Sequence, residues 1–235
     1  MKYRYDLHLH SALSPCGDGD MTPNNILNMA VLNGLQAAAL TDHNSCKNCP
    51  AFLEAARDKP LLALPGMELT TSEEVHVVCL FPALGPAMAF DAYVHDHLPP
   101  IENRPDIFGR QIILNALDEE TGEEPLLLLN ATSISIEEVH SLVAGFGGVA
   151  FPAHADKSST SVLSNLGYFA PEWGFSLCEV ADPSHLNQLR REHPLLEGMK
   201  ILHDSDAHYL WDISGGEHWV ECDDFLAWLG LSGLL

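Results

Sequence analysis

Short apolar runs alternate along the chain with amphipathic stretches, and this alternation limits the fold more than any other feature. The runs lie at residues 6–10, 37–43, 61–68, 75–81, 148–154, 175–181, 199–208 and 218–222. Strands that alternate with helices favour parallel pairing with the helices outside, so we expect an α/β barrel or a large doubly wound sheet. Both architectures place functional residues at the carboxyl ends of the strands, which is where polar residues fall here.

Helix start signals lie between several of these runs. Thr22 is a suitable N-cap before an apolar stripe that ends near Gly34. Ser135 and Glu138 have the spacing of a capping box. Two further helices are predicted to begin after Asp182 and after Asp223.

The chain is expected to form one domain over residues 1–235, because no linker or low-complexity run divides it. Residues 84–134 break the alternation with a helix-like run, an acidic turn and an apolar stretch. This segment is too long for a simple connection, so we expect an insertion packed beside or over the barrel mouth. It could serve as a lid or be a decorative subdomain.

The charge balance is strongly acidic, with 11 Lys and Arg against 33 Asp and Glu and a formal net charge of −22. This charge opposes non-specific binding to anionic polymers and surfaces, so we expect no long nucleic acid and no membrane as partners. A small anionic substrate stays possible because bound divalent ions can make a cleft locally positive. The chain shows no signal-peptide-like leader and no apolar stretch of membrane-spanning length, which favours a cytoplasmic protein.

Six cysteines without a secretory signal indicate reduced thiols rather than a disulfide framework. Cys46 and Cys49 form one CxxC pair. A structural zinc site needs two more ligands, and the nearby sequence supplies none, so we interpret the pair as two thiols at a turn before a helix.

The first apolar run carries His8 and His10, separated by Leu9. The period of a strand places both imidazoles on one face, with Leu7 and Leu9 on the other. Two imidazoles on one face can share a cation if carboxylates from other strands complete the site. The HxH motif alone is equally compatible with a polar strand that binds no metal.

The same residue types recur where later runs end. Each has a structural explanation by itself, such as a helix N-cap for Asp42 or a core histidine for His76. Because all of these residues lie at or near strand ends, the sequence predicts a multinuclear metal site. The residues concerned are Asp42, His43, Glu68, His76, His154, Asp206 and His208.

Five ordered motifs, "DLHLHS", "LTDHN", "GMELTTSEEVHVV", "AHAD" and "SDAH", closely resemble those of the PHP family, the polymerase and histidinol phosphatase domain. The resemblance spans residues 5–208. It implies a distorted, TIM-like (β/α)7 barrel that holds two to three divalent ions, Zn, Mn or Fe, and usually hydrolyses phosphoesters.

The resemblance also implies a set of ligands. His8, His10 and Asp206 would hold the first ion, and Glu68 would bridge it to a second ion at His76 and His154. A third ion would bind His43, His208 and an early acid or histidine. That acid is Asp18 if the chain is counted back from the helix start at Thr22, and Asp20 is the competitor, because the segment "SPCGDGD" departs from the family pattern.

Other candidates surround these ligands. Asp42 could fix the tautomer of an imidazole, with helix capping as the alternative. Lys157 and then Arg104 are the best candidates for binding a substrate phosphate, although each could be an ordinary surface charge. Glu179 could orient a ligand from its strand end without being one. His203 and Asp204 could line the mouth, with a structural role as the alternative.

The predicted function is hydrolysis of a small phosphorylated metabolite or nucleotide by a metal-bridging hydroxide. One alternative is an amidohydrolase-type enzyme acting on C–N bonds, which commonly places a bridging lysine on a mid-barrel strand. The other is a PHP module that binds metal without catalysis. The sequence does not fix the oligomeric state.

Overall fold

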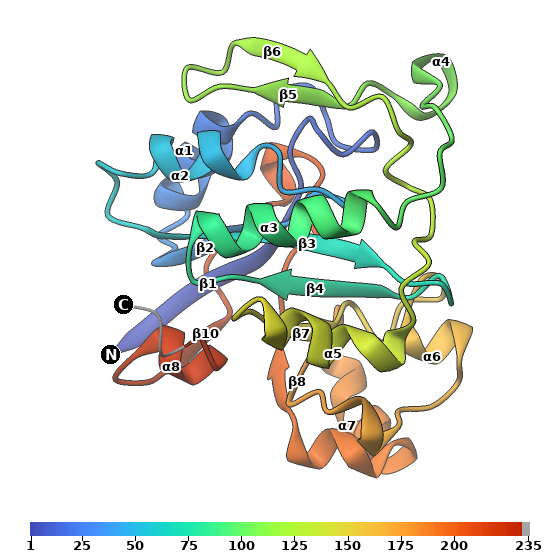
Figure 1. The fold of residues 1–235 in the computed structure, drawn as a ribbon. Coiled ribbons are helices and arrows are strands. Elements are labelled where there is room, and N and C mark those ends of the chain that lie inside the picture. Colours follow the sequence, from blue (N-terminus) through green and yellow to red (C-terminus); the bar gives the residue numbers. More distant parts are fainter. Residues whose placement is uncertain (232–235) are drawn as a thin grey trace.

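A computed structural model describes residues 1–231 (Figure 1). Its strands are β1 (Lys2–Leu9), β2 (Ala37–Leu40), β3 (Leu62–Thr70), β4 (His76–Leu80), β5 (Ile112–Leu114), β6 (Glu120–Glu123), β7 (Val149–Pro152), β8 (Leu177–Glu179), β9 (Lys200–Leu202) and β10 (Trp219–Glu221). Its α-helices are α1 (Pro23–Leu32), α2 (Cys49–Ala55), α3 (Leu84–His95), α4 (Pro105–Phe108), α5 (Ile136–Gly145), α6 (Val162–Asn165), α7 (Leu186–Glu192) and α8 (Phe225–Leu229). Short 3-10 helices are η1 (Pro171–Trp173), η2 (Pro183–His185), η3 (Pro194–Gly198) and η4 (Leu210–Asp212). Every predicted apolar run contains a strand.

Six strands form one curled sheet in the order β10-β1-β2-β3-β4-β7 (Figure 1). As predicted, β1, β2 and β3 pair in parallel. The expected strict alternation is wrong at β4, which pairs antiparallel with both β3 and β7. Only residues 71–75 join β3 to β4, and a connection this short cannot carry the chain back for a parallel pairing.

The strands β8 and β9 form a separate parallel pair that continues the curl. The backbone N–H of Ala155, just after β7, donates to the carbonyl of Glu179 in β8 at 2.8 Å. The N–H of His10, just after β1, donates to the carbonyl of Ala207 at 3.0 Å. These bonds bring the segments after β7 and β9 against β8 and β1, so the sheet is a curled half-barrel with a parallel pair beside it. The count of seven β/α units stays a prediction.

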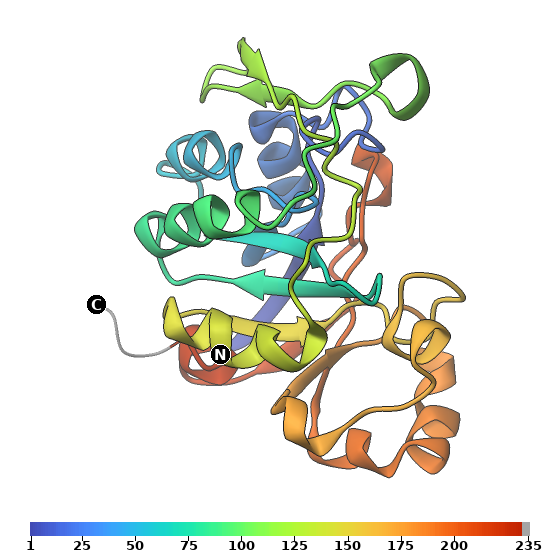
Figure 2. The ribbon, with the colours of Figure 1, turned by 45° about the vertical axis from the view of Figure 1, so that its right-hand side comes forward.

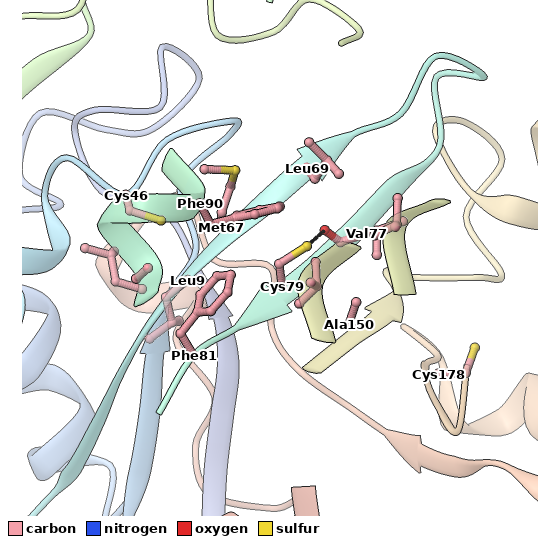
Figure 3. Close-up of a cluster of buried hydrophobic side chains, with 14 of the residues drawn as sticks. Leu9, Cys46, Met67, Leu69, Val77, Cys79, Phe81, Phe90, Ala150 and Cys178 are labelled. Carbon is pink, nitrogen blue, oxygen red and sulfur yellow. Dashed lines mark hydrogen bonds between the residues drawn. The ribbon is translucent and has the colours of Figure 1, made fainter. Parts of the chain in front are cut away.

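Two buried hydrophobic clusters occupy the two faces of the curled sheet. The larger packs strand residues such as Leu9 and Met67 against helix residues such as Phe90 (Figure 3). Phe52 of α2 belongs to the same cluster. The smaller packs the strand residues of the other face against α8, whose Phe225 stacks on Tyr3 at 5.1 Å between ring centroids. Packing on both faces fixes the directions in which the strand-end side chains point.

The helix starts follow the predicted capping signals. The Thr22 hydroxyl accepts from the N–H of Asn25 ahead of α1, and Ser135 and Glu138 form a capping box ahead of α5. The last helix begins one residue later than predicted, because Asp224 rather than Asp223 caps it and accepts from Ala227 N at 3.0 Å.

The segment predicted as an insertion has two parts. Its first part, α3, packs against the sheet and contributes Phe90 and Val94 to the larger cluster. The rest, through α4 and the β5–β6 hairpin, lies beyond the loops that follow β1 and β2, at the top of Figures 1 and 2. The N–H of Ile112 in β5 donates to the carbonyl of Ala12 at 2.9 Å, which joins the hairpin to the loop after β1.

The cysteines are free thiols in the described part of the chain, as expected. Cys46 and Cys49 lie buried at a turn into α2, and both thiols face the carbonyl oxygen of Gly66, at 3.1 and 3.5 Å. No helix between residues 1 and 231 combines the length and the apolar character needed to cross a membrane.

Candidate metal centre

β1 delivers His8 and His10 to the end of the curled sheet where the parallel strands terminate. Both imidazoles are fully buried. The prediction that Leu7 and Leu9 share the opposite face is wrong, since Leu7 belongs to the smaller cluster and Leu9 to the larger one. A register shift between β1 and β2 in this stretch breaks the strict alternation, while His8 and His10 still lie together.

Glu68, near the end of β3, is the centre of the site and has no exposed surface. Five imidazole nitrogens surround its carboxylate: His8 Nε2 at 3.1 Å, His10 Nε2 at 3.3 Å, His43 Nδ1 at 2.9 Å, His76 Nδ1 at 2.8 Å and His154 Nε2 at 3.2 Å. His76 begins β4, and because β4 is antiparallel, its first residue meets the last residues of the parallel strands. The reversed strand therefore supplies a residue to the site from its amino end.

Asp206, after β9, joins the other side of the cluster. Its Oδ1 lies 3.1 Å from His10 Nε2 and 3.4 Å from His8 Nε2. The ring of His208 stacks on that of His10 with centroids 4.2 Å apart. Asp206 and His154 both have positive φ angles, 51° and 28°, which non-glycine residues seldom adopt. Such strain persists where surrounding contacts fix the chain, and it is concentrated at functional sites.

The donor atoms at the centre fit a divalent cation better than they fit one another. His8 Nε2, His43 Nδ1 and Glu68 Oε2 are buried, and none has a hydrogen-bond partner within residues 1–231. His8 donates from Nδ1 to Glu179, so a neutral His8 presents a lone pair at Nε2 toward the Glu68 carboxylate. Facing lone pairs repel unless a proton or a metal ion lies between them, and a set of imidazole and carboxylate donors suits a divalent metal ion.

The side chains form three overlapping groups of potential ligands, and within each group the ligand atoms lie within 4.8 Å of one another. The groups are His8, His10, Glu68 and Asp206; His43, Glu68 and His76; and His10, His43 and His208. The first group is the one expected for a first ion bridged by Glu68. In the second, His43 takes the place expected for His154, although His154 also contacts Glu68. In the third, the early residue beside His43 and His208 is a histidine, His10, which is one of the two residue types expected there.

Protons compensate the carboxylates in the metal-free protein. Burial lowers the pKa of His10, but its interactions with the carboxylates of Asp206 and Glu68 outweigh burial and raise that pKa to about 9. Burial lowers the pKa of His43 to about 3, with the charge of His10 acting in the same direction. Burial alone would raise the pKa of Glu68, but the surrounding imidazoles hold it well below its usual value. The acids of the site are therefore ionised, and His10 binds a proton far more tightly than His43 does. A metal ion that binds His10 would have to displace its proton.

Asp42 orders the loop after β1 and is not a helix cap, because Asn48 is the N-cap of α2. Its carboxylate accepts from Ser11 N at 2.7 Å, from Ser11 Oγ at 2.6 Å and from Ser14 Oγ at 2.7 Å. Since the Ser14 hydroxyl donates to Asp42, its oxygen is left to accept from His10 Nδ1 at 3.0 Å and from the N–H of His43 at 3.1 Å. Ser14 thereby turns the His10 Nε2 lone pair toward the centre, a role that sequence reasoning missed.

Glu179, at the end of β8, orients two of the candidate ligands without joining a ligand group. One carboxylate oxygen accepts from His8 Nδ1 at 2.8 Å, and the other accepts from the backbone N–H of His154 at 3.1 Å. Glu179 has no exposed surface. The strand-end position was the only sequence indication of this role.

His203 and Asp204 have structural partners. The His203 ring contacts the carbonyl of Val180 through Nδ1 at 2.7 Å, and Asp204 accepts from the N–H of Leu7 at 2.7 Å. Both contacts tie neighbouring strands together, in agreement with the structural alternative.

Neither early acid reaches the three groups. The Asp18 carboxylate accepts from the N–H of Asp20 at 2.9 Å, while its own N–H donates to the carbonyl of His208 at 2.9 Å. The loop therefore touches the His208 backbone, but both side chains take part in a local turn or face solvent. Asp18 as a metal ligand stays a prediction.

The two cations expected to bind phosphate have different positions. The Lys157 amine forms an ion pair with Asp206, and 42% of its side chain is exposed at the rim of the centre. Arg104 lies at the start of α4 in the insertion, pairs with Asp106 at 2.9 Å and is 63% exposed. The structure brings Lys157 to the cluster and leaves Arg104 away from it.

Sequence comparison finds two curated relatives. The chain is 31% identical over 83 residues to a 5'-3' exoribonuclease of Haemophilus influenzae, covering 34% of this chain and 29% of that protein. It is 28% identical over 179 residues to the 5'-3' exoribonuclease Rnm of Salmonella typhimurium, covering 72% of this chain and 57% of the relative. The chain thus spans about half or less of the length of each.

Structure comparison finds the same fold in nucleases. A lesion-specific endonuclease of Pyrococcus furiosus superposes with a TM-score of 0.65 at 18% identity, over 89% of this chain and 49% of the other. Endonuclease Q in complex with a 27-mer duplex superposes with a TM-score of 0.60 at 19% identity, over 89% and 50% of the two chains.

These relatives contradict the expectation that long nucleic acid is excluded as a partner, because the curated relatives are named exoribonucleases and Endonuclease Q was solved with a 27-mer duplex substrate. The net charge of the whole surface does not decide what binds at one site, and the sequence expectation allowed a locally positive cleft only for a small anion. A cluster that holds divalent ions sets the potential locally, whatever the sign of the remaining surface.

The sequence also matches the family model for the PHP domain over residues 6–203. The match begins at Asp6 in β1 and ends at His203, just after β9, so it contains most of the strands whose ends form the cluster. The chain therefore belongs to the PHP domain family.

Proposed function

We propose that the protein is a metal-dependent hydrolase of phosphodiester bonds in nucleic acid. The observation that carries this proposal is the convergence of buried, unpartnered imidazole and carboxylate atoms on Glu68 at one end of the curled sheet. The relatives named as exoribonucleases support the substrate class, although this chain spans only part of their length.

The residues proposed to hold two to three divalent ions are the three overlapping groups together with His154. Bound ions would supply an activated water and would neutralise charge on the phosphoryl oxygens and the leaving oxygen. The protein's own contribution is orientation. Glu179 and Ser14 each occupy one nitrogen of a ligand imidazole, His8 and His10 respectively, so that the other nitrogen faces the centre.

Lys157 is proposed to bind a phosphoryl oxygen of the substrate. Its ammonium group lies on Asp206 at the exposed rim, where an incoming phosphate would meet it before reaching the buried acids. A lysine acts there as a point charge and can exchange its carboxylate partner for a phosphate.

The C–N hydrolase alternative has less support in this site. It predicts a lysine as the bridging group on a mid-barrel strand, but Glu68 lies at the centre of the cluster. In the part of the chain that the structure describes, the lysine that contacts the centre is Lys157, and its partner is Asp206.

The test is hydrolysis of a panel of phosphate esters in Mn²⁺, Zn²⁺ or Fe²⁺, with a chelator as the blank. The panel holds single-stranded RNA, single-stranded and duplex DNA, and mononucleotides as small phosphorylated substrates. We expect cleavage of a polynucleotide by the unmodified protein and a loss of at least a hundredfold in Glu68→Gln. The exposed Glu54→Gln variant is the matched control.

Three outcomes would contradict the proposal. Polynucleotide cleavage that persists in Glu68→Gln would place the chemistry elsewhere. Metal binding without cleavage of any ester would instead identify a non-catalytic module, and cleavage of mononucleotides alone would restore the small-substrate prediction.

A further inference from the structure

The surface offers little positive charge to a nucleic acid backbone. The chain has 11 basic residues against 33 acidic ones. Several of these cations already have carboxylate partners: Lys47 with Glu124, Arg104 with Asp106, Arg110 with Glu120 and Glu123, and Lys157 with Asp206. Affinity for a polynucleotide therefore has to come mainly from contacts other than phosphate neutralisation along the strand.

Two exposed aromatic residues lie directly after the metal centre in the chain. Tyr209 follows His208, and Trp211 lies in η4; their side chains stack with ring centroids 5.1 Å apart and an interplanar angle of 19°. Trp211 is 75% exposed and Tyr209 is 40% exposed. The intervening Leu210 packs against the larger hydrophobic cluster instead, which holds the segment in place beneath the two rings.

The position of this pair is fixed relative to the centre. The carbonyl of His208 accepts from the N–H of Asp18, and η4 packs beside α1. In Figure 2 the orange-red segment after β9 runs next to the blue loop after β1. Trp211 lies three positions after His208 in the chain, and such a segment spans at most about 10 Å. A nucleotide next to a phosphate at the centre could therefore reach the rings.

We propose that Tyr209 and Trp211 form a stacking platform for unpaired bases, so that the substrate at this site is a single strand. This inference rests on the proposed function and names the form of its substrate. Every base has a π-face that can stack on an exposed aromatic ring, and stacking tolerates any sequence. Bases inside a duplex already stack on each other and are not available to the platform.

The platform also explains how an acidic protein can hold an anionic strand. Stacking does not release counterions, so binding through the rings predicts a weak dependence on salt. A strand bound through many lysine and arginine contacts would instead lose affinity steeply as salt increases.

The experiment measures the dissociation constant of a labelled, ten-nucleotide, single-stranded RNA by fluorescence anisotropy in EDTA, where no cleavage occurs. Trp211→Ala is compared with Trp219→Ala. Trp219 is 47% exposed, lies on β10 beside the first residues of β1, and packs under the Lys2 amine at 3.6 Å. Removing Trp211 should weaken binding roughly 5-fold to 150-fold, the range seen for one stacked base, and removing Trp219 should have no effect.

Three results would overturn the platform: an equal effect of the two substitutions, equally tight binding of a duplex of the same sequence, or no RNA binding by the unmodified protein. A parallel assay with Mn²⁺ compares kcat/KM for the RNA with that for methyl p-nitrophenyl phosphate, a small diester without a base. The ratio should fall in Trp211→Ala. Cleavage of both substrates with an unchanged ratio refutes the platform alone, while cleavage of neither refutes the proposed function.

Discussion

Glu179 offers the sharpest test of how the centre is held together, because each of its oxygens has a different donor. One accepts from the His8 imidazole at 2.8 Å and the other from the His154 backbone N–H at 3.1 Å. In Glu179→Gln one oxygen becomes an NH2 group of nearly the same size. Whichever way the amide turns, one buried N–H then faces another donor, unless the His8 proton moves from Nδ1 to Nε2, the nitrogen that faces the centre.

The magnitude follows from that single lost partner. Leaving a buried donor unsatisfied costs about 1–3 kcal/mol, so we expect the free energy of unfolding in EDTA to fall by that amount. If the amide oxygen stays on His154, His8 loses the acceptor that fixes its tautomer, and loss of such a partner lowers metal affinity roughly tenfold to hundredfold.

The assay combines urea unfolding in EDTA with calorimetric titration of Mn²⁺ or Zn²⁺, and the exposed Glu54→Gln variant is the control. Both readouts should change in Glu179→Gln and neither in the control. Reduced stability with unchanged metal affinity would show that Glu179 only supports the strands. Unchanged values for both would refute the assignment of its two acceptor contacts.

Three other predictions concern Ser14, Lys157 and the pH dependence of stability. Ser14→Ala removes the hydroxyl between the His10 ring and the His43 backbone, so calorimetry should show about tenfold weaker metal binding. The Ser11 hydroxyl contacts Asp42 but no imidazole in the described chain, so Ser11→Ala should lower stability and weaken metal binding by a smaller factor. Lys157→Ala should lower kcat/KM for a cleaved oligonucleotide roughly tenfold to hundredfold, and Lys157→Arg should recover part of this loss. Unchanged steady-state kinetics in Lys157→Ala would exclude Lys157 from phosphate binding. Urea unfolding in EDTA should show a stability maximum near pH 6.5. The raised pKa of His10, about 9, contributes on the order of 3 kcal/mol of stability that is lost as the pH rises from 6.5 toward 9. The lowered pKa of His43, about 3, makes stability fall as the pH drops below 6.5. A flat stability profile above pH 6.5 would contradict the contribution of His10.

Much of the fold and of the candidate site could be read from local patterns. Each predicted run contains a strand, and the Thr22 and Ser135 caps begin the helices expected from them. Local patterns predict these elements because the spacing of apolar residues and the hydrogen bonds of a helix cap both depend on residues only a few positions apart. The direction of β4 was missed although the five-residue link before it was visible, because the alternation of strands and helices was applied too uniformly.

The parts that could not be predicted depend on contacts between distant segments. The β5–β6 hairpin has little apolar alternation, and all four residues of β6 are exposed. Ser14 is an ordinary loop serine in the sequence, and its importance comes from Asp42, which lies 28 residues away. Likewise, Glu179 reaches His8 across 171 residues of sequence. A sequence pattern identifies candidate ligands, but their orienting partners depend on the register between strands.

Hydrogen bonds connect the predicted insertion to these orienting partners. The Asn48 side chain donates to Ser11 Oγ at 2.9 Å and accepts from the N–H of Leu114 in β5 at 2.9 Å. Ser11 in turn donates to Asp42, the residue that holds Ser14 against His10.

A second contact joins the two segments at Gly109, after α4. Its φ is 99°, and a Cβ there would come within 2.1 Å of the Pro15 carbonyl oxygen. Backbone packed this closely on the loop after β1 leaves that loop little freedom to move. These contacts favour a buttress that keeps the His10 lone pair aimed at the centre, and they explain why polar residues such as Asn48 and Gln111 are fully buried at the junction.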